Sequence, residues 1–393
     1  MKSPALGIIF LTVLIDLLGF GLVITILPAL VTNTFGYPEI VGGMVAGLYS
    51  LMQFLFSSFW GNLSDKYGRR PILLSSSAFT AAAYLIFAFT NNLWLLILSR
   101  ALAGFGSANI SAATAYIADI TTPENRTKSM GIIGAAFGLG FIFGPPLGGY
   151  LIYTYKSLFP VGILAMSLCL VNFLLIYFKL PESLKVKGEG KRPSFIESNK
   201  QAFKELKTPV IGHILMLNFL FIASFSMMQV TSTLLWEDVY QISKKDIGWI
   251  FAFIGLIAAI VQGGLLGKLT KNFKEKFLVN TGWILMAISL GGMAYLPKDN
   301  FWYPNLLLMA MLAFANACIT PVFTSMISKK AEPSHQGRLM GTAQSFSALA
   351  RIIGPVVGGG LYQIMYQLPF ATGGIIMAVS LLGIAALFKE YQV

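Results

Sequence analysis

Three charged residues, Asp16, Arg100 and Arg351, stand well inside long apolar segments of the 393-residue chain. A charge at the centre of a membrane helix costs about 2.5–3.5 kcal/mol on insertion scales, and residues kept there usually face a cavity and mark an ion or proton pathway. We therefore predict that Asp16 exchanges protons. The alternative is an acid that only packs helices, satisfied by hydroxyls such as that of Thr12. Arg351 could pair with Asp16, receive an anionic group of a ligand, or pair within its own half of the chain.

A second concentration of charge occupies the stretch GNLSDKYGRRP at residues 61–71, between two apolar runs. One acid and three bases in one turn are unexpected in a chain with 11% charged residues. Asp65 could stabilise the positive end of a helix, an interaction worth about 0.3–1 kcal/mol at a surface. A basic anchor that fixes the orientation of the chain in a membrane is the simpler interpretation, and it suffices for Lys66 and Arg70.

A third pattern combines amide, hydroxyl and aromatic side chains on one predicted helix. They recur every three or four positions and so share a helix face: Asn218, Phe221, Phe225, Gln229, Ser232 and Trp236. Further amides interrupt other apolar runs at Gln53, Asn109, Gln262 and Asn316. Mostly apolar walls with a few polar groups suit a small-molecule site, so we expect these residues, with Arg351, to line a cavity. Hydrogen bonding between helices is the alternative for each amide.

The segments that carry these residues are long and apolar. Hydrophobic residues make up 56% of the chain, and the mean hydropathy is +0.72. A membrane helix needs roughly 20 mostly apolar residues. Twelve runs satisfy this, near 5–30, 41–61, 71–90, 93–118, 128–153, 159–179, 209–236, 246–268, 277–296, 302–328, 337–365 and 369–388. They do not alternate as the strands of a membrane barrel would, so we predict an all-α membrane protein with twelve transmembrane helices.

The charge distribution predicts the orientation of these helices. Of the 28 Lys and Arg residues, 22 lie in the alternate loops that share a side with the N-terminus and the central polar stretch. Such an excess is typical of cytoplasmic loops, so we expect a multi-pass protein of the cytoplasmic (inner) membrane with both termini in the cytoplasm. The net charge of +12 is then topological and indicates no nucleic-acid partner. The first run contains Asp16 and lacks a cleavage site, so it is predicted to be a retained helix.

The chain divides into two halves. The longest polar stretch lies between Pro181 and Pro209, and we predict a six-helix bundle at 1–180, a cytoplasmic linker at 181–208 and a second six-helix bundle at 209–393. Within the linker, SFIESNKQAFKEL could form an amphipathic helix on the membrane surface. KSMGIIGAAFGLGFIFGPPLGG (128–149) aligns without gaps on RLMGTAQSFSALARIIGPVVGG (338–359). Parallel repeats of this kind are a known transporter plan, with the substrate site between the repeats.

Four motifs occur in order along the first half. They are DLLGFGLVITILP (16–28), GNLSDKYGRRP (61–71), RALAGFGSA (100–108) and GFIFGPPLGG (140–149). Together they resemble the helix 1 pattern, the loop between helices 2 and 3, the helix 4 motif and the helix 5 antiporter motif of the major facilitator superfamily. The branch they resemble is that of the twelve-helix drug–proton antiporters. YSLMQFLFSSFWGNLSDKYGRRPILL and LLWEDVYQISKKDIGWIFAFIGL are similar to segments of the tetracycline-exporter group within it.

This resemblance implies roles for further residues. A conformational latch is implied for Gly61, Asp65, Gly68, Arg69 and Asp119. In the family's architecture, Asp65 faces Gly337 and Arg338 at the start of helix 11, and Arg69 can reach Asp119, both only when the cytoplasmic side is closed. Because Lys271 stands where the acid of the second half would be, the latch is expected to be one-sided.

The other motifs also carry implied roles. The antiporter motif supplies Gly140, Gly144, Pro145, Gly148 and Gly149, which would allow close helix packing and a kink. Arg100 is linked to proton transfer in the family, although a structural clamp that is bonded to the backbone is the alternative.

The resemblance also predicts an activity. We expect a secondary active transporter, a proton-coupled exporter of small amphipathic or lipophilic compounds that works by alternating access. A symporter or facilitator of a polar metabolite or lipid-like amphiphile is the alternative, and a membrane receptor is a third. Ala83, Ala258 and Met286 replace ionisable residues of the tetracycline exporters, so tetracycline itself is not expected.

The expected partners follow from this activity. They are a small-molecule substrate, protons and membrane lipids. The motif GxxxxGK[ST] is absent, so ATP is not expected as the energy source. Cys169 and Cys318 both lie in apolar runs, so no metal or disulfide is expected, and we predict no cofactor and no enzymatic activity.

Overall fold

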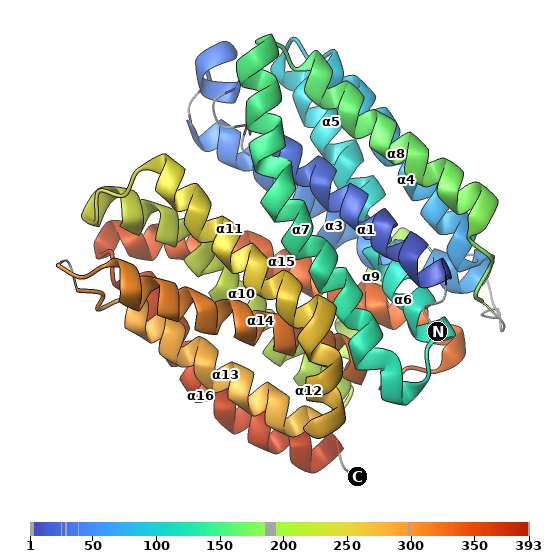
Figure 1. Cartoon of the computed structure of the whole chain (residues 1–393). Coiled ribbons are helices and arrows are strands. Elements are labelled where there is room, and N and C mark those ends of the chain that lie inside the picture. Colours follow the sequence, from blue (N-terminus) through green and yellow to red (C-terminus); the bar gives the residue numbers. More distant parts are fainter. Residues whose placement is uncertain are drawn as a thin grey trace.

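The computed structural model describes residues 4–24, 26–27, 30–37, 39–184, 194–297 and 299–391, and within these ranges it contains helices and no strand (Figure 1). Among these described residues, eleven helices are long and apolar enough to cross a membrane. The last predicted run but one corresponds to α15 (Gln336–Ile364), which is equally long but less apolar because it contains Arg351 and several glycines. The predicted all-α membrane fold is confirmed. Residues 185–193 of the predicted linker lie outside the described ranges.

The first half consists of helices that pack around two apolar clusters, one near each end of the bundle. The elements are α1 (Pro4–Ile24), η1 (Leu30–Thr34), α3 (Glu39–Tyr67), α4 (Arg69–Ala88), α5 (Leu93–Gly106), η2 (Ser107–Asn109), α6 (Ile110–Ile120), α7 (Pro123–Tyr155) and α8 (Phe159–Lys179). Local chemistry fixes their ends. Gly68 takes a φ of 109°, in the left-handed region that favours glycine, and so separates α3 from α4. Asn92 caps α5 by accepting a hydrogen bond from the backbone N–H of Leu95.

The second half packs around a core of its own, in which Trp283 contacts the rings of Phe221 and Phe323. The elements are α10 (Ile211–Leu234), η3 (Leu235–Val239), α11 (Lys244–Ile260), η4 (Val261–Leu265), α12 (Leu266–Asn272), α13 (Glu275–Met293), α14 (Trp302–Lys330), η5 (Pro333–His335), α15 and α16 (Leu368–Tyr391). The core residues belong to the second half with the exception of Ala115, so each half buries its own apolar residues.

The two halves lie side by side, blue to green on one side and yellow to red on the other (Figure 1). They meet mainly where α3 packs along α15 and where α7 packs along α11 and α14. Glycines allow the close approach: a Cβ at Gly61 would collide with the backbone of Gly337, and one at Gly341 with Ser57 and Ser58. These contacts lie toward the end that carries the turn at Gly68 and the start of α15. We call it the linker end.

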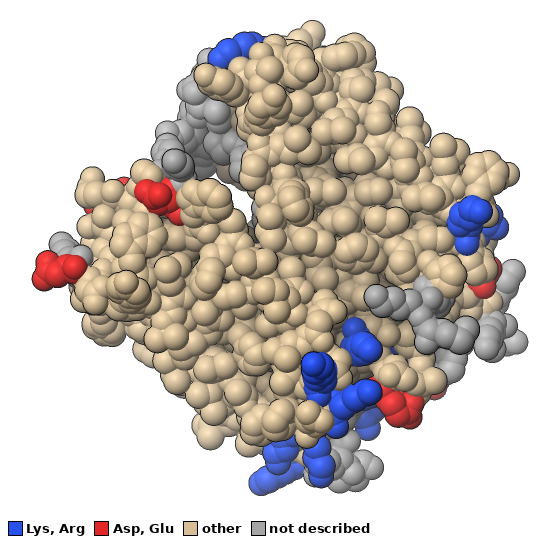
Figure 2. Space-filling view, in the orientation of Figure 1, with Lys and Arg blue, Asp and Glu red and all other residues tan. Residues whose placement is uncertain are grey.

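The surface differs between the two ends. Figure 2 shows basic side chains gathered at the linker end of this face, and it shows the surface hollowed between the two halves at the opposite end. Lys268 and Lys271 of α12, with Lys274 and Lys276 around the start of α13, belong to the linker end. The halves contact one another at the linker end, and the surface between them is hollowed at the opposite end. The described molecule is therefore closed at the linker end.

The predicted amphipathic helix is present as α9 (Phe195–Glu205), capped by Ser194. It lies against protein and spans both halves. The ring of Phe195 is 4.9 Å from that of Phe56 on α3, and the ring of Phe203 is 5.5 Å from that of Phe346 on α15. Because its apolar side chains bridge α3 and α15, α9 covers the seam between the halves.

Candidate functional site

Asp65 joins the two halves at the linker end. Its Oδ1 accepts a hydrogen bond of 2.7 Å from the backbone N–H of Gly337, and its Oδ2 accepts one of 2.7 Å from that of Arg338. Both N–H groups belong to the first turn of α15, where they have no partner within the helix. A carboxylate there also meets the positive end of the helix dipole. The contacts implied for Asp65 are present.

Arg69 holds this carboxylate in place from α4. Its Nη1 lies 2.5 Å from Asp65 Oδ1, its Nε lies 3.1 Å from Asp119 Oδ2, and Nη1 also donates to Ser64 Oγ at 2.8 Å. The Arg69 side chain is fully buried. A buried guanidinium requires opposite charges close by, and two carboxylates supply them. The structure thus brings Gly61, Asp65, Gly68, Arg69 and Asp119 together at one end.

Glu182 is a member of this region that sequence reasoning missed. Its carboxylate accepts hydrogen bonds from the backbone N–H groups of Arg69 and Arg70, at 2.9 and 3.1 Å, in the first turn of α4. The neighbouring Ser183 hydroxyl donates to Asp119 Oδ2 at 2.9 Å. The only sequence signal was an acid directly after the apolar run of α8, and it was assigned to the linker.

A second contact between the halves corrects the expectation of a one-sided latch. Glu275 Oε1 accepts a hydrogen bond of 3.2 Å from the Thr127 hydroxyl of α7. The same oxygen forms an ion pair with Lys329 Nζ at 2.7 Å. Thr127 lies in the first half, and Glu275 begins α13 in the second. The sequence alignment placed the expected acid at Lys271. The acid that makes this contact is Glu275, four residues later, in the first turn of α13. The alignment of the two loops compared a different position and therefore did not identify it.

Asp16 is buried within the first half, at 2% exposure. Its Oδ2 accepts a hydrogen bond of 3.2 Å from Asn109 Nδ2, while Oδ1 has no hydrogen-bond partner among the described residues. The Thr12 hydroxyl does not satisfy it, since it lies 2.9 Å from Ile8 O and from Asn172 Oδ1 instead. A buried carboxyl group with one amide partner and a vacant oxygen has a place to hold a proton.

Arg100 is fully buried beside aromatic rings. Its guanidinium carbon lies 5.5 Å from the ring centre of Tyr84 and 5.1 Å from that of Phe87, and Nη2 donates to Ser99 Oγ at 3.1 Å. Within the described ranges it forms no ion pair with an acid, Asp16 included. Cation–π contacts and the Ser99 hydroxyl, rather than backbone oxygens, therefore hold Arg100 in this conformation among the described residues.

Arg351 reaches across the seam between the halves. Its Nη2 donates a hydrogen bond of 3.0 Å to Gln53 Oε1 on α3. The expected alternatives of pairing with Asp16 or within its own half are not found in the part of the chain that the structure describes. The positive charge of Arg351 is thus held by a neutral amide of the other half.

The polar and aromatic stripe, which runs from α10 into the π-helical turn η3, corrects another expectation. Phe221 and Trp236 are fully buried in the core of the second half, where Trp236 Nε1 donates to Asn305 Oδ1 at 3.1 Å. Asn218 donates to Ser347 Oγ at 3.1 Å within the same half. A period of three to four residues identifies a shared face but not what that face meets. These three residues therefore pack the bundle rather than line a cavity.

The remaining predicted cavity residues occupy different surroundings. Phe225 and Gln229 are half-buried on α10. Asn316 accepts a hydrogen bond from the Thr320 hydroxyl one turn away. Gln262 lies at the contact between the halves. It is buried in the π-helical turn η4 against Gly134 of α7, and its Oε1 has no hydrogen-bond partner among the described residues.

The glycines of the antiporter motif pack α7 against α1. Gly140 approaches Leu17, Gly144 approaches Gly21, and Gly148 approaches the backbone of Leu22. Gly149 faces open space. Pro145 lies within α7, which continues as one helix from Pro123 to Tyr155. The predicted close packing is present for three of the four glycines.

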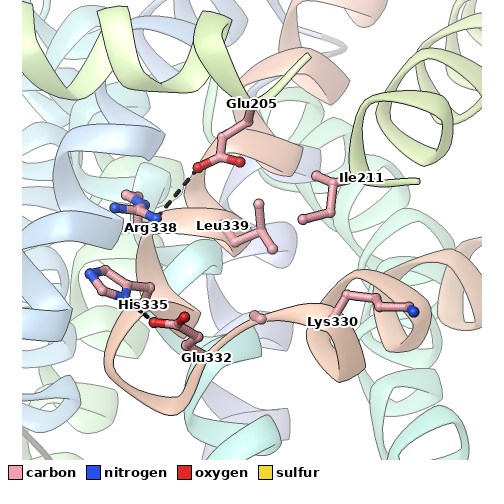
Figure 3. A pocket seen from close by; sticks show the side chains of 8 residues that line it. Glu205, Ile211, Lys330, Glu332, His335, Arg338 and Leu339 are labelled. Carbon is pink, nitrogen blue, oxygen red and sulfur yellow. Dashed lines mark hydrogen bonds and ion pairs between the residues drawn. The ribbon is translucent and has the colours of Figure 1, made fainter. Parts of the chain in front are cut away.

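A pocket of about 200 Å³ lies at the linker end, away from these buried groups (Figure 3). Glu205 at the end of α9 forms an ion pair of 3.4 Å with Arg338, and Glu332 contacts His335 at 3.2 Å. Arg338 is the residue whose backbone N–H binds Asp65. The pocket therefore borders the contact between Asp65 and Arg338, and its charged groups already have partners within the chain.

Comparisons with known proteins place this geometry in context. The family profile described as Major Facilitator Superfamily matches residues 9–303 and 238–392. The chain is 33% identical to the class C tetracycline resistance protein of Escherichia coli, over 92% of this chain and 91% of that protein. It is 28% identical to multidrug resistance protein 2 of Bacillus subtilis, over 98% and 94% of the two chains.

The chain is also similar to a solved structure over almost its full length. The crystal structure of the human organic anion transporter MFSD10 matches with a TM-score of 0.87 at 26% identity, covering 98% of this chain and 100% of that one. The bovine major facilitator superfamily domain-containing protein 10 is 28% identical over 92% of this chain and 88% of its own length.

Proposed function

Since the chain belongs to the major facilitator superfamily of membrane transporters, we propose that it is a proton-coupled exporter of small amphipathic or lipophilic compounds. The observation that carries this proposal is the buried carboxyl group of Asp16, which has an amide for a partner and a vacant oxygen. The chain is a transporter and not an enzyme, so the binding of a proton there has to act on conformation rather than on a bond.

Alternating access supplies the conformational part of the proposal. The contacts of Asp65 and Glu275 join the halves at the linker end, and the opposite end is hollowed between them (Figure 2). In the proposed orientation the linker end faces the cytoplasm, because the basic residues gather there. The described conformation is then the one that releases substrate outward, and transport requires these contacts to break and reform.

Protons drive the cycle by differential affinity. A ligand shifts a two-state equilibrium only as far as its affinities for the two states differ. In this proposal, Asp16 binds a proton more tightly in one conformation, and the proton gradient is thereby converted into directed movement. Arg100 serves as a neighbouring positive charge that can exchange its aromatic contacts for Asp16 during the cycle.

Arg351 favours a particular kind of substrate. Its charge lacks an acidic partner among the described residues and contacts the amide of Gln53 across the seam between the halves. A buried positive charge of this kind is stabilised by an anionic group, so we propose that amphipathic compounds with a carboxylate or similar group bind best. Similar proteins include a multidrug resistance protein and an organic anion transporter, which is in keeping with this proposal.

Transport into sealed vesicles tests the proposed function. Purified protein is reconstituted into liposomes with an imposed pH gradient, and uptake of the anionic dye fluorescein, the cationic dye ethidium and tetracycline is followed. Proton-driven accumulation is expected, strongest for the anion and weakest for tetracycline. A facilitator would equilibrate the dyes without accumulating them, and this result would contradict the proposal.

A further inference from the structure

The helix that carries Arg100 is interrupted at its middle by the 3-10 turn η2, Ser107–Asn109, between α5 and α6. Short 3-10 segments within a helix have weaker hydrogen-bond geometry and often mark a hinge. Ser107 and Asn109 are both buried, at 0% and 1% exposure. A weak backbone turn at the centre of a membrane bundle needs a reason, and the contacts at its two ends suggest one.

The two ends of η2 contact different functional residues. At one end, Asn109 Nδ2 donates to Asp16 Oδ2 at 3.2 Å. At the other, the carbonyl oxygen of Ser107 accepts a hydrogen bond of 3.4 Å from Gln53 Nε2 on α3. The turn therefore joins the carboxyl group of α1 to an amide of α3 through two residues.

Gln53 extends this path across the seam. Its Oε1 accepts the hydrogen bond of 3.0 Å from Arg351. A guanidinium can only donate and a carbonyl can only accept, so the amide of Gln53 can satisfy both neighbours in one orientation only. A continuous series of contacts thus leads from Asp16 in the first half to Arg351 in the second.

We propose that η2 and Gln53 form the coupling element, which transmits the protonation state of Asp16 to the contact between Gln53 and Arg351. Asn109 and Gln53 are then positioning residues for coupling rather than walls of the substrate cavity. The inference rests on the proposed function, because it presumes that protons bind at Asp16.

The chemistry of the hydrogen bonds gives this element a direction. A bond from an amide to an ionised carboxylate is roughly twice as strong as one between neutral groups. Protonation of Asp16 therefore weakens its hold on Asn109, and the poorly bonded turn η2 is the part that relaxes. The Ser107 carbonyl then moves relative to Gln53, and the cross-half bond to Arg351 loses its support.

Other titratable groups surround Asp16 on several helices. Tyr49 of α3, Tyr84 of α4 and Cys169 of α8 lie within electrostatic range of it, and Arg100 of α5 lies near both tyrosines. The described residues of α7 meet α1 through glycines. Tyrosine, cysteine and arginine side chains titrate above pH 8 when unperturbed. The loss of the response in Asp16→Asn, and not the pH range alone, therefore assigns it to Asp16 rather than to His335 or the acids of the linker end.

The distance between the halves, measured as a function of pH without substrate, tests the proposal. Spin labels are placed at Asn91→Cys and Asn300→Cys, two exposed loop residues at the hollowed end, with Cys169→Ala and Cys318→Ala as background. The parent protein is expected to shift its distance distribution between pH 5 and pH 8. Asp16→Asn, Asn109→Ala and Gln53→Ala should each reduce the change in the population ratio of the two states between pH 5 and pH 8 by about 5-fold or more, the lower end of typical coupling.

Two further variants separate coupling from folding. Gln53→Met keeps most of the volume of the side chain and adds no titratable group, but it cannot donate a hydrogen bond to the Ser107 carbonyl, so it should lose the pH response while it folds normally. Thr324→Ala removes a half-buried hydroxyl of α14 whose hydrogen bond goes to the carbonyl oxygen of Thr320 one turn away, and it should respond to pH as the parent does.

The outcomes distinguish the two proposals. A pH response of parental size in Asn109→Ala, Gln53→Ala and Gln53→Met, with loss only in Asp16→Asn, would overturn the coupling element and leave the proton site intact. A parent protein that does not respond to pH at all would overturn both.

Discussion

The carboxylate of Asp65 binds the backbone N–H of Gly337 at 2.7 Å, which ties the end of α3 in one half to the first turn of α15 in the other. The bond depends on charge and on an unpaired main-chain donor rather than on a particular side chain. It can therefore form and break without a change of packing in either core. This is what a reversible contact between two rigid bundles requires.

Replacement of Asp65 by Asn should slow transport and leave substrate binding intact. The amide loses the charge that meets the start of α15, an interaction worth up to about 2 kcal/mol when partly buried. The closed conformation should then be disfavoured about 5- to 30-fold. The initial rate of dye exchange and the Kd of the same dye are measured in parallel. A large loss of affinity in folded protein would assign Asp65 to the substrate site instead.

The Glu275 contact should make a smaller and independent contribution. Its carboxylate is partly exposed, and its ion pair with Lys329 belongs to a class worth about 0–1 kcal/mol. Glu275→Gln should therefore slow exchange less than Asp65→Asn does, and the double variant should combine both effects because the two sites share no partner. Glu332→Gln, at an exposed position, is the matched control. Equal rates for Glu275→Gln and the control would remove Glu275 from the closing contacts.

A disulfide across α7 and α11 should lock the described conformation. A Cβ built at Gly138 lies 3.7 Å from the Cβ of Ala258, within the range of 3.5–4.5 Å that disulfides adopt. Gly138→Cys with Ala258→Cys, in a background without Cys169 and Cys318, should stop dye exchange on oxidation and recover it on reduction. Each single cysteine serves as a control. Exchange at the full rate in the oxidised, cross-linked protein would contradict alternating access.

Helix α9 should stay docked through its two phenylalanines. Aromatic contacts contribute about 0.5–1.5 kcal/mol beyond burial, so Phe195→Ala or Phe203→Ala should raise tryptic cleavage at Lys200 and Lys204 roughly 2- to 12-fold. Ile196→Ala, whose side chain is 76% exposed, should leave the rate unchanged. Equal cleavage of all three variants would mean that α9 is held by other contacts.

Much of the fold could be predicted because membrane helices can be identified in a sequence by their length and apolar composition. The latch contacts could be predicted as well, since Asp65 and Arg69 lie in a motif that resembles a known family. The amphipathic spacing around Phe195 and Phe203 likewise sufficed to locate α9. In each of these cases the signal is local in the sequence.

The parts that could not be predicted depend on which face of a helix packs in the core, which contacts the other half and which is exposed. Phe221 and Trp236 share a face with polar residues, and only packing shows that this face enters the core. Glu182 and Glu275 act across more than one hundred residues of sequence, at helix starts that spacing does not identify. Asn109, which contacts Asp16, lies in the 3-10 turn η2 between α5 and α6. The sequence of this segment reads as one continuous apolar run, so the turn could not be predicted from it.

The role of Asp16 is the central claim, and Asp16→Asn tests it most directly. The amide keeps the size of the side chain but cannot take up a proton, so the free energy of the proton gradient no longer acts on the conformational equilibrium. Pocket contacts remain, and exchange down a gradient should continue. The measurement compares fluorescein accumulation under an imposed pH gradient with counterflow at equal pH, in the same vesicles. We predict that the variant loses accumulation and retains counterflow at a rate close to that of the parent. Full accumulation by the Asp16→Asn variant would contradict the assignment.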